Sequence, residues 1–198
     1  MRGVVAALAG AAFSIGGSLS SPAAAQLLPG GPSLQVSGEM GSVWTRESLL
    51  DSSRHDGGMT AGASAQFNFP VVGGIYTGLG ASLLIGDMSA TSNIQFLLPM
   101  DGIIGARFVP ADSQRPLSVY AFGGPALAAV ELNSGIYPGT ELMMGWSIGA
   151  GAEVQLSQPW SVGLKYRHFE VDQQAPVTMR GDMVTLTVGY RFPIQPPR

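Results

Sequence analysis

The sequence predicts an all-β protein, an eight-stranded antiparallel up-and-down β-barrel that spans a membrane. Apolar and polar residues alternate along eight segments, and a period of two is typical of strands with one face in an apolar environment. Charged residues make up only 12% of the 198 residues, about half the share of an average globular domain. Beyond residue 32 no apolar run is long enough for a transmembrane helix.

The first residues have the composition of a secretory signal. Arg2 supplies a positive charge, residues 3–19 are apolar, and Ala23-Ala24-Ala25 fits the small-residue cleavage motif. We therefore expect residues 1–25 to be removed as a signal peptide by cleavage near Ala25. An uncleaved anchor is the alternative, but the stretch is short for a span. The Pro and Gly of residues 26–33 predict a linker before the barrel.

The predicted barrel covers residues 34–192, and its first four strands each have one apolar face. In chain order these faces carry Leu34, Val36 and Met40; Ala61, Ala63, Ala65, Phe67 and Phe69; Ile75, Thr77, Leu79, Ala81, Leu83 and Ile85; and Ile94, Phe96, Leu98, Met100, Ile104, Ala106 and Phe108. Pro99 lacks an N–H for the strand ladder, which weakens the prediction at that point of the fourth strand.

The last four strands follow the same rule. Residues 117–132 are extended, but Gly123-Gly124-Pro125 breaks the alternation and indicates a bulge. Residues 144–156 alternate over their whole length, which exceeds the five or six residues of an average soluble strand and fits a tilted membrane strand. Residues 161–167 and 184–192 complete the set.

The connections predict which end of the barrel faces out of the cell. Residues 70–74, 110–116 and 157–159 are short and rich in turn residues, whereas 45–58, 87–92, 133–140 and 172–181 are mostly longer and more polar. Short turns on one side and longer loops outside the cell are typical of transmembrane barrels. A Pro-rich tail, residues 193–198, follows the last strand.

The charges of the strands distinguish a membrane barrel from a soluble one. They fall on the Gly, Ser, Thr and Gln face and not on the apolar face; the residues are Glu39, Arg107, Glu153, Lys165, Arg167 and Arg191. A soluble barrel reverses this arrangement. We therefore expect lipid outside and a polar interior, with a soluble secreted β-sandwich as the alternative.

Charges inside a narrow barrel must be paired, because an isolated buried charge costs several kcal/mol. Glu153 and Lys165 are expected to pair across neighbouring strands. Arg107, Arg167 and Arg191 should compete for the other carboxylates, with Glu39 the second acceptor. The sequence thus predicts an ionic network that closes the lumen.

The last hairpins resemble a known family. Residues 146–156, 160–167 and the closing Val-Thr-Leu-Thr-Val-Gly-Tyr-Arg-Phe192 are similar to small outer-membrane β-barrel proteins of the OmpA/OmpX and opacity-protein type. The resemblance implies that Tyr190 and Phe192 form the assembly signal, and that the partners are the barrel-assembly machinery, outer-membrane lipid and lipopolysaccharide. Unlike many members, this chain continues past the final aromatic residue.

Candidate chemistry is sparse. The chain has no Cys, a net charge of −3 and no basic cluster, which argues against thiolate chemistry and nucleic acid. His168 lacks the following Ser and Asn that a resemblance to barrel lipid A deacylases would require, and His55 is expected in a solvated polar loop. Gly145, Gly149 and Gly151 are expected to leave space inside the barrel. No catalytic, cofactor or metal site is predicted.

Trp44, Trp146 and Trp160 lie near strand ends and are expected to anchor the barrel at the membrane interfaces. We therefore predict a monomeric, non-enzymatic protein of the bacterial outer membrane, with a structural or surface-interaction role. Two alternatives are a lipid A modifying enzyme and a narrow pore for small solutes.

Overall fold

The computed structural model describes residues 25–27, 31–49, 52–88, 92–110, 113–134, 137–172 and 177–194. Within these residues lie one short strand and eight long ones. In chain order they are β1 (Ala25–Leu27), β2 (Ser33–Leu49), β3 (Ser52–Val72), β4 (Ile75–Met88), β5 (Ser92–Pro110), β6 (Leu117–Ser134), β7 (Tyr137–Gln155), β8 (Trp160–Asp172) and β9 (Val177–Pro193). In this part of the chain no helix is long and apolar enough to cross a membrane.

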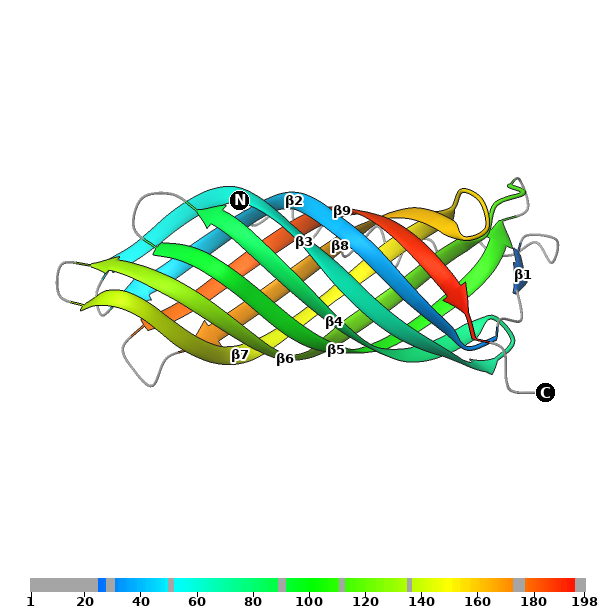
Figure 1. The fold of residues 1–198 in the computed structure, drawn as a ribbon, viewed down its shortest axis with the longest axis horizontal. Coiled ribbons are helices and arrows are strands. Elements are labelled where there is room, and N and C mark those ends of the chain that lie inside the picture. The colour runs from blue at the N-terminus through cyan, green and yellow to red at the C-terminus, as the bar shows by residue number, and fades with distance from the viewer. Residues whose placement is uncertain are drawn as a thin grey trace.

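The eight long strands close into a barrel, which confirms the predicted fold class (Figure 1). Each pairs antiparallel with its neighbours in the chain, and β2 pairs with β9 to close the sheet. A path that steps from each residue to its register partner on the next strand circles the barrel once. Begun at Trp44 on β2, it returns to β2 at Leu34, ten residues away. Such a stagger requires the strands to tilt relative to the barrel axis.

The short strand β1 adds to one edge of β5. Ala25–Leu27 pairs with Phe108–Pro110, beyond the point where β4 begins. Figure 1 shows it at the same end of the barrel as the turns that follow β3, β5 and β7. We call this the turn end, and the opposite end the loop end. The predicted signal peptide lies almost wholly outside the described residues, so its cleavage stays a prediction.

The strands reach farther toward the loop end than expected. The segment 45–58 was predicted as a loop. In the structure β2 extends to Leu49 and β3 begins at Ser52, and the two strands are paired there. The same holds for most of the other three long connections. Outside the membrane the outer face of a strand meets water instead of lipid, so the membrane pattern of apolar outside and polar inside ends although the backbone ladder continues. Sequence patterning therefore missed these extensions.

The direction of the side chains agrees with the alternation in most strands. Along β9, Thr185, Thr187 and Gly189 are buried, while Leu186 and Val188 are exposed. Ile94 is an exception, since it was expected outside and is buried in the interior. A register shift between Ile94 and Phe96 changes the facing of the residues before it.

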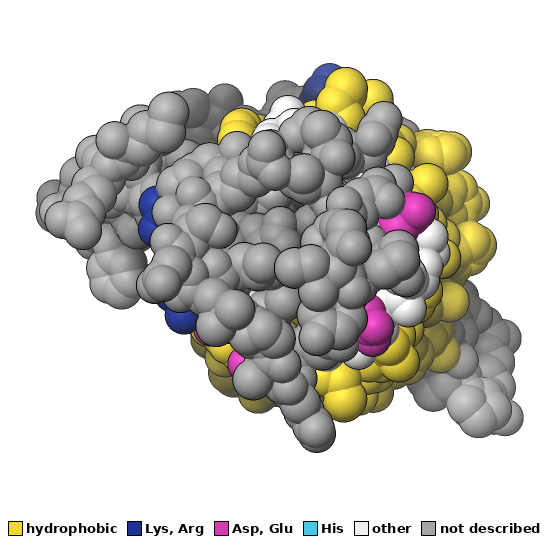
Figure 2. Space-filling view, turned by 90° about the vertical axis from the view of Figure 1, so that its left-hand side faces the viewer, with side chains coloured by type: hydrophobic (Ala, Val, Ile, Leu, Met, Phe, Trp, Pro, Cys, Tyr) yellow, Lys and Arg dark blue, Asp and Glu magenta, His cyan; other side chains and the backbone are white. Residues whose placement is uncertain are grey.

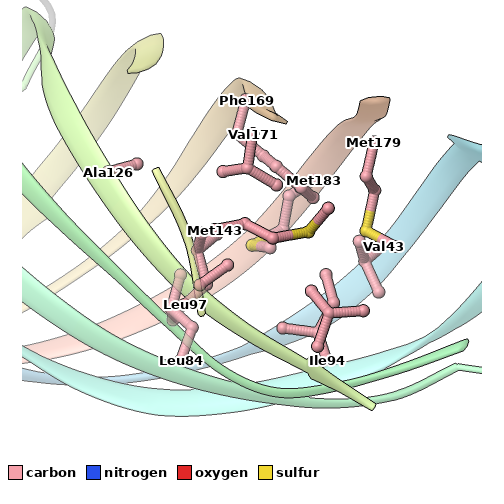
Figure 3. Close-up of a cluster of buried hydrophobic side chains, with 12 residues drawn as sticks. Val43, Leu84, Ile94, Leu97, Ala126, Met143, Phe169, Val171, Met179 and Met183 are labelled. Carbon is pink, nitrogen blue, oxygen red and sulfur yellow. The ribbon is translucent and has the colours of Figure 1, made fainter. Parts of the chain in front are cut away.

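The interior is not polar throughout, which corrects another expectation. A cluster of buried apolar side chains fills the half of the lumen toward the loop end (Figure 3). Its members are Val43, Leu84, Ile94, Leu97, Ala126, Ala128, Val130, Met143, Phe169, Val171, Met179 and Met183. We call it the apolar plug. Phe169 and Met143 are completely buried within it.

Candidate functional site

Two ion pairs span the lumen below the apolar plug. Lys165 on β8 donates from Nζ to Glu39 Oε1 on β2 at 2.7 Å. Two residues further along β8, Arg167 binds Asp101 on β5 through both carboxylate oxygens, at 2.9 Å and 2.7 Å. All four side chains are less than 10% exposed. Neither β2 nor β5 is adjacent to β8 in the sheet, so these pairs tie strands across the barrel.

A second group lies nearer the turn end, around Glu153. This carboxylate accepts hydrogen bonds from Gln35 Nε2 at 2.8 Å and 3.0 Å and from the Tyr120 hydroxyl at 3.1 Å. Arg191 Nη2 lies 3.9 Å from it and donates to Gln35 Oε1 at 2.8 Å. Arg107 contacts Ser118 Oγ at 3.3 Å and stacks over the Tyr76 ring.

The structure thus places all six predicted residues in the lumen but pairs them differently. Lys165 was expected to bind Glu153 and instead binds Glu39. In the register Lys165 lies opposite Gly151, and Glu153 lies opposite Gly163. Glu153 already has neutral donors from β2 and β6, whereas Lys165 reaches an acceptor across the lumen.

Sequence reasoning did not include Asp101 in the network. Asp101 directly follows Met100 of the apolar face, so the alternation turns its side chain inward. That inward facing is the signal that could have identified it. Its partner Arg167 also donates to Ser147 Oγ at 2.7 Å and lies 4.6 Å over the centre of the Phe122 ring. Asp101 is therefore the centre of a fully buried polar cluster.

Glycines make room for the aromatic rings of the interior. A Cβ at Gly151 would lie 2.5 Å from the Tyr120 ring, and one at Gly149 would lie 2.4 Å from the Phe122 ring. Gly149 and Gly151 of β7 thus leave the space that these two rings of β6 occupy. This agrees with the expectation that these glycines leave space in a narrow lumen.

The outer surface carries an apolar band between two aromatic borders. On β9 the band lies between Asp182 at the loop-end side and Phe192 at the turn-end side. Its outward residues there include Val184, Leu186 and Val188. Ten residues of a strand tilted by about 40° rise about 25 Å, the height of the lipid-facing band of outer-membrane barrels. All three tryptophans are about half exposed on this surface.

At the loop-end border a polar cluster faces outward. Asp182 Oδ1 accepts from the Tyr166 hydroxyl at 2.6 Å and lies 2.9 Å from His168 Nδ1. The His168 ring lies 5.5 Å from the Trp146 ring. One step nearer the loop end, Arg180 binds Glu170 at 3.0 Å in an exposed pair. Seen from that end, charged side chains lie at the rim and apolar ones on the flank (Figure 2).

At the turn-end border Tyr190 lies between two aromatic rings. Trp160 is 5.1 Å from it and Phe192 is 4.6 Å from it. Among the described residues no three His, Cys, Asp or Glu side chains gather as a metal site. The side chain of His55 lies outside the described part.

The closed barrel, its lipid-compatible surface and its charged interior define a class of membrane protein. The chain matches the model of the outer membrane protein beta-barrel domain over residues 9–192. It belongs to this family, which confirms the resemblance predicted from its last hairpins. The family places the protein in the bacterial outer membrane.

Solved structures share the fold at low identity. Neisserial surface protein A is 14% identical with a TM-score of 0.54, covering 80% of this chain and 97% of that one. Ail of Yersinia pestis is 14% identical, and the N-terminal barrel domain of Pseudomonas aeruginosa OprF is 16% identical; both have TM-scores of 0.51 and cover 83% of this chain and all of theirs. No curated protein matches the chain.

Proposed function

We propose that this protein is a non-enzymatic, monomeric barrel whose role is structural or surface-interactive, with its loop end outside the cell. One observation carries the proposal: the lumen is occupied along its length by the protein's own side chains. The apolar plug fills one half, and ion pairs and aromatic rings fill the other. A filled barrel serves as an anchor, so interactions are left to the outer surface and the loop end.

The loop-end border suits contact with lipopolysaccharide. Arg46 and Arg180 are register partners on β2 and β9, and both are exposed. They lie just beyond the band border marked by Trp44, which is the partner of Asp182. Guanidinium groups bind phosphate bidentately, and tryptophan rings favour the headgroup region. We propose that these residues contact the phosphate-bearing headgroups of the outer leaflet.

A lipid A modifying activity is the second candidate, and one contact favours it. His168 and Asp182 form the base and orienting carboxylate that nucleophilic catalysis uses. Among the described side chains, however, no Ser or Thr hydroxyl is hydrogen-bonded to His168, whose ring packs on Trp146. We favour the reading of Tyr166, His168 and Trp146 as amphipathic anchors at the membrane interface.

Labelling of tags on intact cells tests the proposed orientation. An even number of strands returns the chain to the side on which it started. An epitope inserted near Ser53 should be labelled from outside, whereas one appended after Arg198 should be labelled only after lysis. Both tagged proteins should fractionate with the outer membrane. Labelling in the opposite pattern would overturn the orientation.

We further propose that Tyr190 and Phe192 act as the signal that the assembly machinery recognises. Replacing both with Ala is expected to reduce the inserted fraction several-fold. The matched control replaces Phe67 and Phe69 with Ala; these residues form an outward aromatic pair with rings 4.5 Å apart. Phe67 and Phe192 are both register partners of Leu34, so the two variants change the same level of the barrel. Equal losses in the two variants would mean that the aromatics act only as lipid-facing surface.

A further inference from the structure

Among the residues that the structure describes, the turn end of the lumen has more cationic groups than carboxylates. Further inside, Lys165 and Arg167 each have their own carboxylate. At the turn end, in the described part of the chain, Arg107 and Arg191 share the neighbourhood of one carboxylate, that of Glu153. Glu153 already accepts from Gln35 and Tyr120, and Arg191 is 3.9 Å away. For Arg107, within the described residues, the hydrogen-bond acceptor is a neutral hydroxyl, Ser118 Oγ.

Buried donors without an acceptor lie at the same end. The Nδ2 atom of Asn68 and the Nε atom of Arg191 are buried and have no hydrogen-bond partner. Asn68 is only 4% exposed, and its Oδ1 is held by the Gln66 amide at 2.6 Å. A buried donor without an acceptor costs about 1–3 kcal/mol, so an acceptor at this position would stabilise the barrel.

A small cavity brings these two features together. It is lined by Ser33, Asn68, Tyr76, Arg107 and the glycines of the β3–β4 turn. Its volume is about 20 Å³, which is room for one ligand of about the size of a water molecule. The positive φ of Gly73, 56°, forms the tight turn that borders the cavity. The cavity therefore presents an uncompensated guanidinium and an unpaired amide donor to the same small space.

We propose that this cavity binds a small anion, with Arg107 supplying the charge and Asn68 a hydrogen bond. A chloride ion is close to the size of this space, whereas an anion of several heavy atoms is larger than it. Water alone could satisfy the Asn68 donor, but it would leave the excess charge of Arg107 uncompensated. The apolar plug blocks access from the loop end, so the anion enters from the turn end.

Urea unfolding of the purified barrel in lipid vesicles tests this site. Sodium chloride is titrated against sodium gluconate at constant ionic strength, because gluconate is too large for the cavity. The wild type should gain stability from chloride in a saturable way, with the folding equilibrium constant rising about tenfold at ten times Kd.

The variants separate binding from general salt effects. Arg107→Gln should lose the saturable gain, and Asn68→Asp, which places a carboxylate in the cavity itself, should make the barrel insensitive to chloride. Arg115→Gln removes a charge from an exposed residue of the β5–β6 turn at the same end and should behave like the wild type. Absence of saturation in the wild type, or an equal gain in Arg107→Gln, would overturn the proposal.

Discussion

Replacing Asp101 with Ala is expected to lower the free energy of unfolding by about 3–5 kcal/mol, because it leaves the Arg167 guanidinium buried without a counter-charge. Both side chains are about 5% exposed, and two hydrogen bonds of 2.9 Å and 2.7 Å join them. Water cannot easily replace the lost carboxylate at this depth. Urea unfolding of the vesicle-inserted barrel measures the loss.

Glu170→Ala is the matched control, because it breaks an ion pair of similar length at the surface. Glu170 and Arg180 are 3.0 Å apart, but the arginine side chain is 59% exposed. Pairs of this kind contribute about 0–1 kcal/mol. The double variant Asp101→Leu with Arg167→Met should recover much of the loss, since it removes both buried charges. Similar losses in the Asp101 and Glu170 variants would contradict a lumen held by buried ion pairs.

The sequence predicted the barrel because lipid requires a strict pattern. Lipid requires apolar residues on the outer face of each strand that crosses the band, and in β7 and β9 these alternate with mostly small or polar inward residues. The direction in which Glu39, Glu153 and Lys165 point could be derived for the same reason. A side chain in a strand has only two faces available.

The partners of these charges could not be derived in this way. Cross-strand rules identify neighbours in the sheet, whereas Lys165 binds Glu39 and Arg167 binds Asp101 across the lumen. Those contacts depend on the stagger of the closed barrel and on the length of each side chain. The alternation of apolar and polar residues along a single strand determines neither the stagger nor the reach of a side chain across the lumen.

The apolar plug was missed for a related reason. Near the loop end the inward residues of β8 and β9 are Phe169, Val171, Met179 and Met183, while outward residues include Glu170, Arg180 and Asp182. There the pattern inverts, because the strands have left the lipid and the barrel resembles a soluble one. Met179 and Arg180 of this stretch fell in the predicted loop 172–181, and the inward apolar residues outside that loop were not recognised as a buried cluster.

The apolar plug is expected to prevent the barrel from conducting ions. Ions would have to pass side chains such as Phe169, Met143 and Val130, which are completely buried. Below them the ion pairs of Lys165 and Arg167 block the polar half. An eight-stranded barrel is only wide enough for its own side chains. The wild-type lumen should therefore be closed to hydrated ions along its whole length.

Conductance of the purified wild-type barrel in a planar lipid bilayer tests the closed lumen most directly. Insertion is verified first, by protection of the membrane-spanning strands from protease in vesicles of the same lipid. The account predicts no steady single-channel current under an applied potential. Stable, porin-like conductance steps from the inserted wild type would contradict both the closed lumen and the non-pore function.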